Sequence, residues 1–413
     1  MIKASEISTA MLGDGNATTL ASLALLSEIQ KAELGVQFTP GEIRQQPETW
    51  KKTFRIFHDR QDEIRSFLDS SGLAGESRST VSVSLIGAGT SDYIGRSLLS
   101  LLRSKWKCGV TLNASTDLLT ESDSFVSSSP ADTRHLWISF SRSGDSFEGV
   151  RVLEQAYDRF PEIRHIIVTC NSAGRMANDL AKGHDNVMCL VLPDEVNDRG
   201  LAMTSSFTNM VVAGQCLANI DDLGRYQSVV ETLSSIAETC LPEIADAASA
   251  LADQRFERIC FLGSGPLKGV ADESALKVLE LSGGFHSTMS ESFLGLRHGP
   301  LSWLNKNSLV VGFVSNDPEK AKVELGLLAE IRKKKAAAAV IAVAGESPNV
   351  SRHVDLDLSF PIPSGIADDF LPPFYVLFGQ CLGLFSSLSL GLMPDSPSAD
   401  GKIQRVVSNI EIA

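Results

Sequence analysis

The chain has 413 residues, of which 43% are hydrophobic and 21% are charged, as is usual for a globular protein with a sizeable core. Its 37 basic and 50 acidic residues give a net charge of −13, which argues against a nucleic-acid surface. No window approaches about 18 uninterrupted apolar residues, so we expect no membrane span. The start, Met1–Glu6, lacks the pattern of a signal peptide. The seven scattered cysteines are typical of reduced residues in a cytoplasmic protein.

An amphipathic stretch near the N-terminus predicts one helix over residues 19–32. Its apolar side chains recur at helical spacing, as Leu20, Leu23, Leu26 and Ile29. We therefore assign residues 1–50 to an N-terminal helical segment that leads into the first of two larger units.

From residue 81 onward, apolar β-branched runs alternate with longer helix-like segments, which predicts parallel sheets covered by helices. The runs form two sets of four with similar spacing: 81–86, 135–140, 164–169 and 187–192, then 258–262, 308–314, 338–343 and 354–360. A helical connector over about 227–254 joins the two sets. The predicted fold class is therefore α/β.

The turns after the runs also correspond between the two sets. Gly87-Ala-Gly89 matches Gly263-Ser-Gly265, and each set ends in an apolar helix that contains Gly-Gln-Cys-Leu. These matches indicate an internal duplication. We place the two copies at 51–220 and 221–392. The Pro/Ser/Asp-rich remainder, 393–413, is predicted to be a tail that is disordered unless it closes over a site.

Serines concentrate where the second run of the first copy turns into a helix. Residues 139–146 read Ser-Phe-Ser-Arg-Ser-Gly-Asp-Ser. Such a turn offers hydroxyls, backbone N–H groups and the positive end of a helix dipole, which together suit a phosphate. Thr90 and Ser91 follow a strand at the same edge, where Asp92 excludes a dinucleotide motif by replacing its third glycine. The alternative is that these residues only cap helices.

Two further motifs lie in the second copy. Glu273, Lys277 and Glu280 fall on one face of a predicted helix, and the alternative to a functional site is a solvated row of ion pairs. Arg297-His-Gly-Pro300 holds a histidine beside a rigid turn. A histidine fixed in this way is a candidate acid/base group, although a lone histidine is more often structural.

Together these residues resemble the sugar isomerase (SIS) family. The closer likeness is to its tagatose-6-phosphate ketose/aldose isomerase group, whose members act as D-galactosamine-6-phosphate deaminase/isomerases. The resembling segments are 42–47, 116–118, 139–146, 198–200 with 203–206, 275–281, 297–300, and 394–398 with 405–407. The resemblance implies two tandem SIS domains, the first phosphate-binding and the second carrying the catalytic helix. Each would be a flavodoxin-like parallel sheet flanked by helices.

The resemblance also implies roles for individual residues. The phosphate of a phosphosugar would be bound by Thr90, Ser91, Ser141, Arg142, Ser143 and Ser146. Glu280 would be the base at the sugar's C2, with Lys277 and Glu273 as positioning or charge-setting groups. His298 would open the sugar ring and reach the site from a partner subunit, so a homodimer or higher homo-oligomer is expected. Lys402 and Arg405 are the tail candidates for the lysine that engages the open-chain sugar in glucosamine-6-phosphate synthase, but neither matches it clearly.

The predicted activity is a D-galactosamine-6-phosphate deaminase/isomerase that yields D-tagatose 6-phosphate and ammonia. We expect no metal or redox cofactor, and no nucleic-acid or membrane partner. Ammonia release is the expected direction because no glutamine-hydrolysing domain is visible. Two alternatives stay open: a plain aldose–ketose isomerase of a hexose 6-phosphate, and a sugar-phosphate-sensing regulator. The configuration of the sugar at C4 is open as well.

Overall fold

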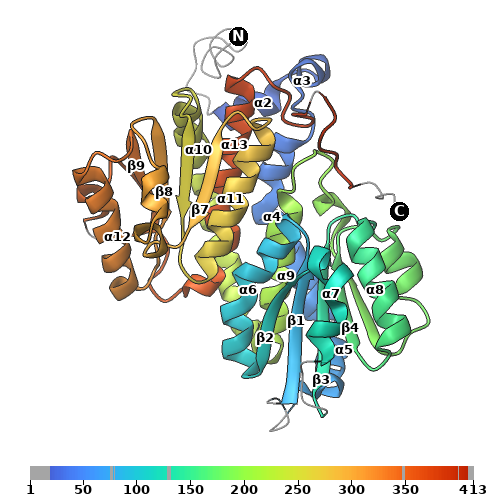
Figure 1. The fold of residues 1–413 in the computed structure, drawn as a ribbon. Coiled ribbons are helices and arrows are strands. Elements are labelled where there is room, and N and C mark those ends of the chain that lie inside the picture. Colours follow the sequence, from blue (N-terminus) through green and yellow to red (C-terminus); the bar gives the residue numbers. More distant parts are fainter. Residues whose placement is uncertain are drawn as a thin grey trace. The chain divides into compact units, whose positions relative to one another are not determined.

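The computed structural model describes residues 19–74, 78, 80–127, 132–346, 349–398 and 400–407, and it contains two five-stranded parallel sheets. The first sheet has the order β2-β1-β3-β4-β5 (Figure 1). The second, β10-β9-β8-β6-β7, has the same order when its strands are taken from the opposite edge. This order is that of flavodoxin-like folds. The predicted α/β class with two flavodoxin-like copies is confirmed.

All eight predicted strands are present, and the structure adds two that the sequence analysis missed. The strands are β1 (Val81–Gly87), β2 (Gly109–Ala114), β3 (Arg134–Ser141), β4 (Arg164–Thr169), β5 (Val187–Val191), β6 (Arg258–Leu262), β7 (Ser287–Glu291), β8 (Ser308–Phe313), β9 (Ala339–Gly345) and β10 (Leu356–Phe360). The missed strands, β2 and β7, are equivalent edge strands. Both carry polar residues, and β7 has no buried residue, so neither shows the apolar run of a strand covered on both faces.

Helices cover the first sheet. They are α6 (Thr90–Trp106), α7 (Ser115–Ser127), α8 (Phe147–Arg159) and α9 (Ser205–Ala218). Helix α6 packs against α9, and α7 packs against α8 (Figure 1). Leu118 of α7 and Val152 of α8 join Ile86 and Trp137 of the sheet in one buried cluster. These contacts hold the starts of α6 and α8 at the carboxyl edge of the sheet.

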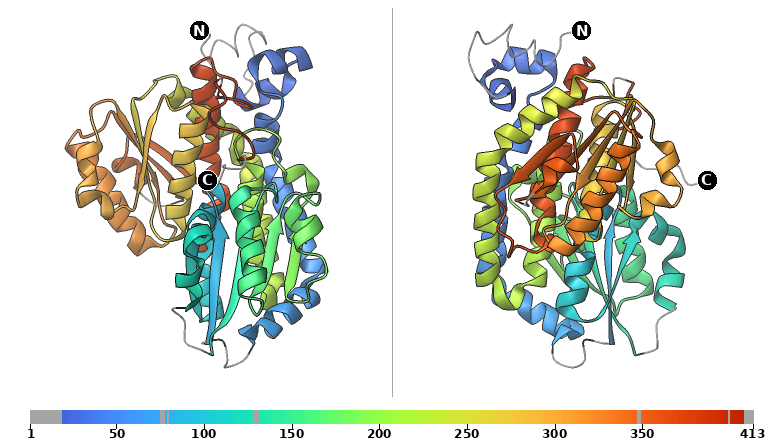
Figure 2. Two further views of the ribbon diagram at one scale, coloured as in Figure 1. Left: turned by 45° about the vertical axis from the view of Figure 1, so that its right-hand side comes forward. Right: turned by 90° about the vertical axis from the view of Figure 1, so that its left-hand side faces the viewer.

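The second sheet is covered by α11 (Pro266–Leu281), α12 (Pro318–Lys333) and α13 (Pro372–Ser389). Figure 2 shows α12, in orange, against the strands of this sheet. Helix α13 packs along α11. A Cβ added at Gly379 of α13 would lie 2.2 Å from the Ser274 Oγ of α11, so this close approach requires glycine.

The chain divides into two compact units. The first-sheet unit comprises the described residues of 48–197, 205–230 and 403–407, and the second-sheet unit those of 19–47, 198–204 and 231–402. Helices α4 (Thr39–Asp59) and α10 (Leu223–Ala252) each contribute to both units. Helix α10 confirms the predicted connector. Helix α5 (Gln61–Leu68) completes the longer helices, and no helix in the described part of the chain is long and apolar enough to cross a membrane.

The single N-terminal helix predicted over 19–32 is wrong. The structure has two helices there, α2 (Thr19–Leu25) and α3 (Glu28–Leu34). Ser27 ends the pattern because it caps α3 in a reciprocal capping box with Gln30. Leu20, Leu23 and Leu26 are buried as the spacing predicts, whereas Ile29 is 73% exposed because it belongs to the second helix.

Candidate active site

Residues 139–146, which we call the serine turn, run from the end of β3 to the start of α8 in the first-sheet unit. Hydrogen bonds within the turn fix its geometry. Ser141 Oγ accepts a hydrogen bond from the Gly144 N–H at 3.0 Å, and Ser143 Oγ accepts one from the Asp145 N–H at 3.1 Å. Gly144 has φ +66°, a left-handed conformation that favours glycine. Because both hydroxyls act as acceptors in these bonds, each keeps its hydrogen for donation to an anion.

The turn after β4 braces the serine turn from the side. The Asn171 side-chain amide donates to the Ser143 carbonyl at 2.8 Å. The Arg175 N–H donates to Asp145 Oδ1 at 2.8 Å, and the Met176 N–H donates to the Gly144 carbonyl at 3.0 Å. These bonds preorganise the turn.

Thr90 and Ser91 lie at the first turn of α6, directly after the neighbouring strand β1, and both are buried. A Cβ on Gly87 would lie 2.3 Å from the backbone of Ser91, so the turn passes closely over the strand end. The N-cap of α6 is Gly89, and the Ser146 side chain makes no capping bond within the described part of the chain. The alternative, in which these residues only cap helices, would need a side-chain cap at the start of α6 or α8, and among the described residues neither helix has one at its N-cap.

Arg142 and Arg405 are brought together in the first-sheet unit. The Arg142 guanidinium, which is buried, donates to the Arg405 carbonyl oxygen. The Arg405 guanidinium in turn donates to Asn197 Oδ1 at 2.7 Å. Lys402, by contrast, is 81% exposed and pairs with Asp400 at 2.7 Å. Of the two tail candidates, Arg405 is the one that contacts the serine turn.

The predicted row on α11 is a buried charge cluster in the second-sheet unit. Lys277, 1% exposed, places its Nζ 2.6 Å from Glu280 Oε2 and 3.4 Å from Glu273 Oε1. Glu273 is fully buried, whereas the Glu280 side chain is 24% exposed. The alternative of a solvated row of ion pairs is therefore wrong. A buried lysine needs such partners because an unpaired charge in the interior is costly, and Glu280 alone of the three reaches solvent.

His298 lies in a tight loop between two short 3₁₀ turns, Gly295–Arg297 and Pro300–Trp303. The loop requires Gly299, whose φ is +120°. His298 is exposed, and no other residue that the structure describes makes a hydrogen bond or ion pair with its imidazole. Arg297 lies 3.7 Å from Glu330. The histidine is thus presented to solvent from one chain.

Sequence reasoning assigned no role to a cluster of three acidic residues in the second-sheet unit. Glu42 Oε1 accepts hydrogen bonds from the N–H groups of Arg199, at 2.5 Å, and of Gly200, at 3.2 Å. Burial, followed by the nearby carboxylates of Asp198 and Asp395, raises the pKa of Glu42 to about 8. Glu42 therefore keeps its proton to a higher pH than an exposed carboxyl group does.

The same cluster ties the start of the tail to the N-terminal helices. Asp395 Oδ1 accepts bonds from the Thr39 N–H at 2.8 Å and the Thr39 hydroxyl at 2.7 Å. Asp198 Oδ2 accepts one from the Thr204 N–H at 2.8 Å. The sequence contained a signal for these acids, since they fall in the resembling segments 42–47, 198–200 and 394–398. Their separation in the chain concealed that they meet.

Comparison with known proteins places the chain in a family. No protein-family model matches it. It is 35% identical over 390 residues to the D-galactosamine-6-phosphate deaminase AgaS of Escherichia coli, covering 91% of this chain and 95% of the relative. The AgaS of Shewanella sp. (strain ANA-3) is 30% identical, covering 94% and 95%. The solved tagatose-6-phosphate ketose/aldose isomerase of E. coli is 33% identical, covers 87% of this chain and 94% of its own, and has a TM-score of 0.78.

Two flavodoxin-like sheets in tandem, with a serine turn at the carboxyl edge of the first, define a protein of the SIS class. Within that class, the chain belongs to the family of the AgaS D-galactosamine-6-phosphate deaminases.

Proposed function

We propose that this protein is a D-galactosamine-6-phosphate deaminase/isomerase that produces D-tagatose 6-phosphate and ammonia. The names of relatives that match nearly the whole chain support this function. The observation that carries it is the α11 row, in which a buried lysine holds one carboxylate, Glu280, at the solvent boundary. A base that must remove a carbon-bound proton needs access to substrate and a fixed position.

The phosphate end of the substrate is assigned to the first-sheet unit. Thr90, Ser91, Ser141, Ser143 and Ser146 offer hydroxyl donors, and Arg142 offers a buried positive charge. A phosphate is bound well by such a set because charge-assisted bonds are roughly twice as strong as neutral ones. The Arg405 carbonyl, which now accepts from Arg142, would yield that donor to the phosphate.

Ring opening is assigned to His298. The imidazole moves a proton between the ring oxygen and the anomeric hydroxyl, which exposes the C1 aldehyde. An imidazole has one nitrogen that can donate a proton and one that can accept a proton, so it can serve both proton transfers. The exposure of His298 in one chain is compatible with delivery to the site of a second subunit, and we propose a homodimer or higher homo-oligomer on this basis.

Proton transfer is assigned to Glu280. The carboxylate removes the C2 proton, which the aldehyde has acidified, and the C1 oxygen takes up a proton, which gives an enolamine. Return of a proton to C1, with loss of one from nitrogen, converts the enolamine into a ketimine at C2. Water then adds to C2, and ammonia leaves to give the 2-ketose. Lys277 and Glu273 act as positioning residues, since Lys277 contacts Glu280 at 2.6 Å and Glu273 at 3.4 Å. None of these steps transfers electrons to an external acceptor.

A second candidate function is the plain aldose–ketose isomerase. It would use the same residues, and the name of the E. coli structure favours it. A sensor would have no need for the buried row on α11. The experiment is an ammonia-release assay over hexosamine 6-phosphates, run beside isomerisation of tagatose 6-phosphate. Ammonia from galactosamine 6-phosphate supports the deaminase, whereas isomerisation without ammonia from any hexosamine 6-phosphate supports the alternative.

We also propose the organisation of the chain around this chemistry. The phosphate-binding SIS domain spans 51–220 and the catalytic one spans 221–392, after the helical segment 1–50, of which residues 1–18 lie outside the described part. Of the tail, 393–413, the structure describes 393–398 and 400–407. We propose that this described part closes over the site, on the basis of the contact between Arg405 and Arg142. A cytoplasmic location is proposed because all seven cysteines are free thiols.

A further inference from the structure

The second sheet has its own strand-to-helix turn at the position of the serine turn. Strand β8 lies between β6 and β9, just as β3 lies between β1 and β4. The register makes Phe313 equivalent to Phe140, because Leu262 pairs with Gly312 as Ile86 pairs with Ser139. The N-cap position of helix α12 is Asp317, four positions after Phe313. The N-cap position of helix α8 is Ser146, six positions after Phe140. The second turn is therefore shorter.

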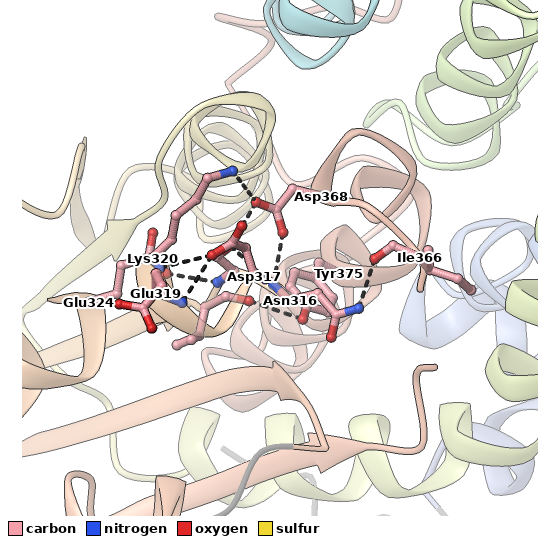
Figure 3. Close-up of polar contacts among 10 residues, drawn as sticks. Asn316, Asp317, Glu319, Lys320, Glu324, Ile366, Asp368 and Tyr375 are labelled. Carbon is pink, nitrogen blue, oxygen red and sulfur yellow. Dashed lines mark hydrogen bonds and ion pairs between the residues drawn. The ribbon is translucent and has the colours of Figure 1, made fainter. Parts of the chain in front are cut away.

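A buried carboxylate from elsewhere in the chain occupies this second turn. Asp368, 7% exposed, comes from the segment before α13 (Figure 3). Its Oδ1 accepts from the Asn316 N–H at 2.8 Å. Its Oδ2 accepts from the Ser315 hydroxyl at 2.7 Å and from Lys320 Nζ at 3.0 Å. A backbone N–H, a hydroxyl and a cation at the start of a helix are the donors that bind a phosphate.

A second carboxylate uses the remaining donors of this turn. Glu324 Oε2 accepts from the Ser315 N–H at 2.7 Å, and the Ser264 hydroxyl also donates to Glu324. Glu324 is seven positions after its helix cap, and the equivalent position in the first sheet is Leu153. Ser264 corresponds to Ala88 in the matching Gly-x-Gly turns. The polar pair of the second copy is thus an apolar pair in the first.

We infer that Asp368 is an internal anion that fills the second copy of the phosphate site. The comparison with the serine turn rests on the proposed function, but the donor set around Asp368 stands by itself. The carboxylate closes the second turn to phosphosugars, so that each chain carries one phosphate site. It also fixes the start of α13, which packs on α11, the helix that carries Glu273, Lys277 and Glu280. The second turn thus binds a side chain of its own chain in the place of a phosphate.

The test is to remove the internal anion and ask whether an external one replaces it. Inorganic phosphate is titrated into wild type and Asp368→Ala by calorimetry, and the Asn316 amide is followed by NMR. We expect one more phosphate per chain in the variant, with a phosphate-dependent shift of the Asn316 signal that wild type lacks. Glu346→Ala removes an exposed acid after β9 at the same edge and should add no site. The double variant Asp368→Ala/Lys320→Ala should lose the gained site.

The counted quantity is the increment over wild type, so the result does not depend on where the first phosphate binds. If Asp368→Ala is poorly folded, its melting temperature is measured in phosphate and in chloride at matched ionic strength. Phosphate should then raise the melting temperature of Asp368→Ala more than that of wild type or the double variant. The inference is overturned if Asp368→Ala is folded and binds no more phosphate than wild type. It is also overturned if Asp368→Ala is unstable and phosphate does not stabilise it more than wild type.

Discussion

The serine turn after β3 and the turn after β8 occupy the same place in two sheets of the same order. The side chains gathered at the two turns nevertheless differ in charge. The first is longer and presents hydroxyls and Arg142, and its position equivalent to Glu324 is the buried, apolar Leu153. The second is shorter and is filled by the carboxylates of Asp368 and Glu324. The two copies share a fold. Under the proposed function, a few side chains decide which of the two turns binds the phosphate.

The largest expected effect concerns Glu280, the proposed base on α11, and separates catalysis from phosphosugar binding. Glu280→Gln should lower kcat by roughly 10²–10⁴-fold, the usual effect of losing a general base. Phosphosugar binding should persist, because the serine turn is unchanged. Steady-state kinetics and calorimetry measure the two effects. Glu319→Gln, an exposed acid on α12, is the control and should behave as wild type. Near-normal turnover of Glu280→Gln would remove this residue from its role.

The comparison predicts that equivalent substitutions in the two turns have unequal effects on substrate affinity. Arg142→Ala should raise KM by about 10- to 100-fold, since a charged hydrogen bond contributes about 1.5–3 kcal/mol. Ser143→Ala should raise it by about tenfold or less. Ser315→Ala in the second turn should leave KM unchanged, because Ser315 already bonds to Asp368. Equal changes in KM for Ser143→Ala and Ser315→Ala would erase the distinction.

The smallest expected effect is on the pH dependence of stability. Burial raises the pKa of Glu324 to about 7 and that of Glu42 to about 8, from a usual value of 4.5. The folded chain therefore holds these protons more tightly than the unfolded chain, and stability should fall as pH rises from about 5 to about 8. Glu324→Gln and Glu42→Gln should each flatten this slope, measured as urea midpoints across that range. Slopes identical to wild type would contradict the raised pKa values of these two buried carboxyl groups.

Much of the fold could be predicted because eight strands carry apolar runs, the edge strands β5 and β10 included. The other two edge strands, β2 and β7, could not be predicted, since polar residues such as Thr111 and Ser290 interrupt their apolar pattern. The break at Ser27 was visible in the sequence as a serine followed three positions later by a glutamine, but the apolar spacing outweighed it.

The candidate site was predictable where its residues are neighbours in sequence. The α11 row follows from helical spacing, and the serine turn from its composition. The roles of Glu42 and Asp368 were not predictable in this way. Asp368 meets Ser315 across 53 residues, and Glu42 meets Arg199 across 157. Such contacts depend on tertiary packing that no local pattern encodes.

The most direct measurement is a crystal structure with galactosamine 6-phosphate bound to Glu280→Gln. The account predicts one ligand per chain, its phosphate on residues 141–146 and on Ser91, and its second carbon beside the side chain of residue 280. A phosphate seated on Ser315, or a second carbon beyond the reach of residue 280, would contradict it.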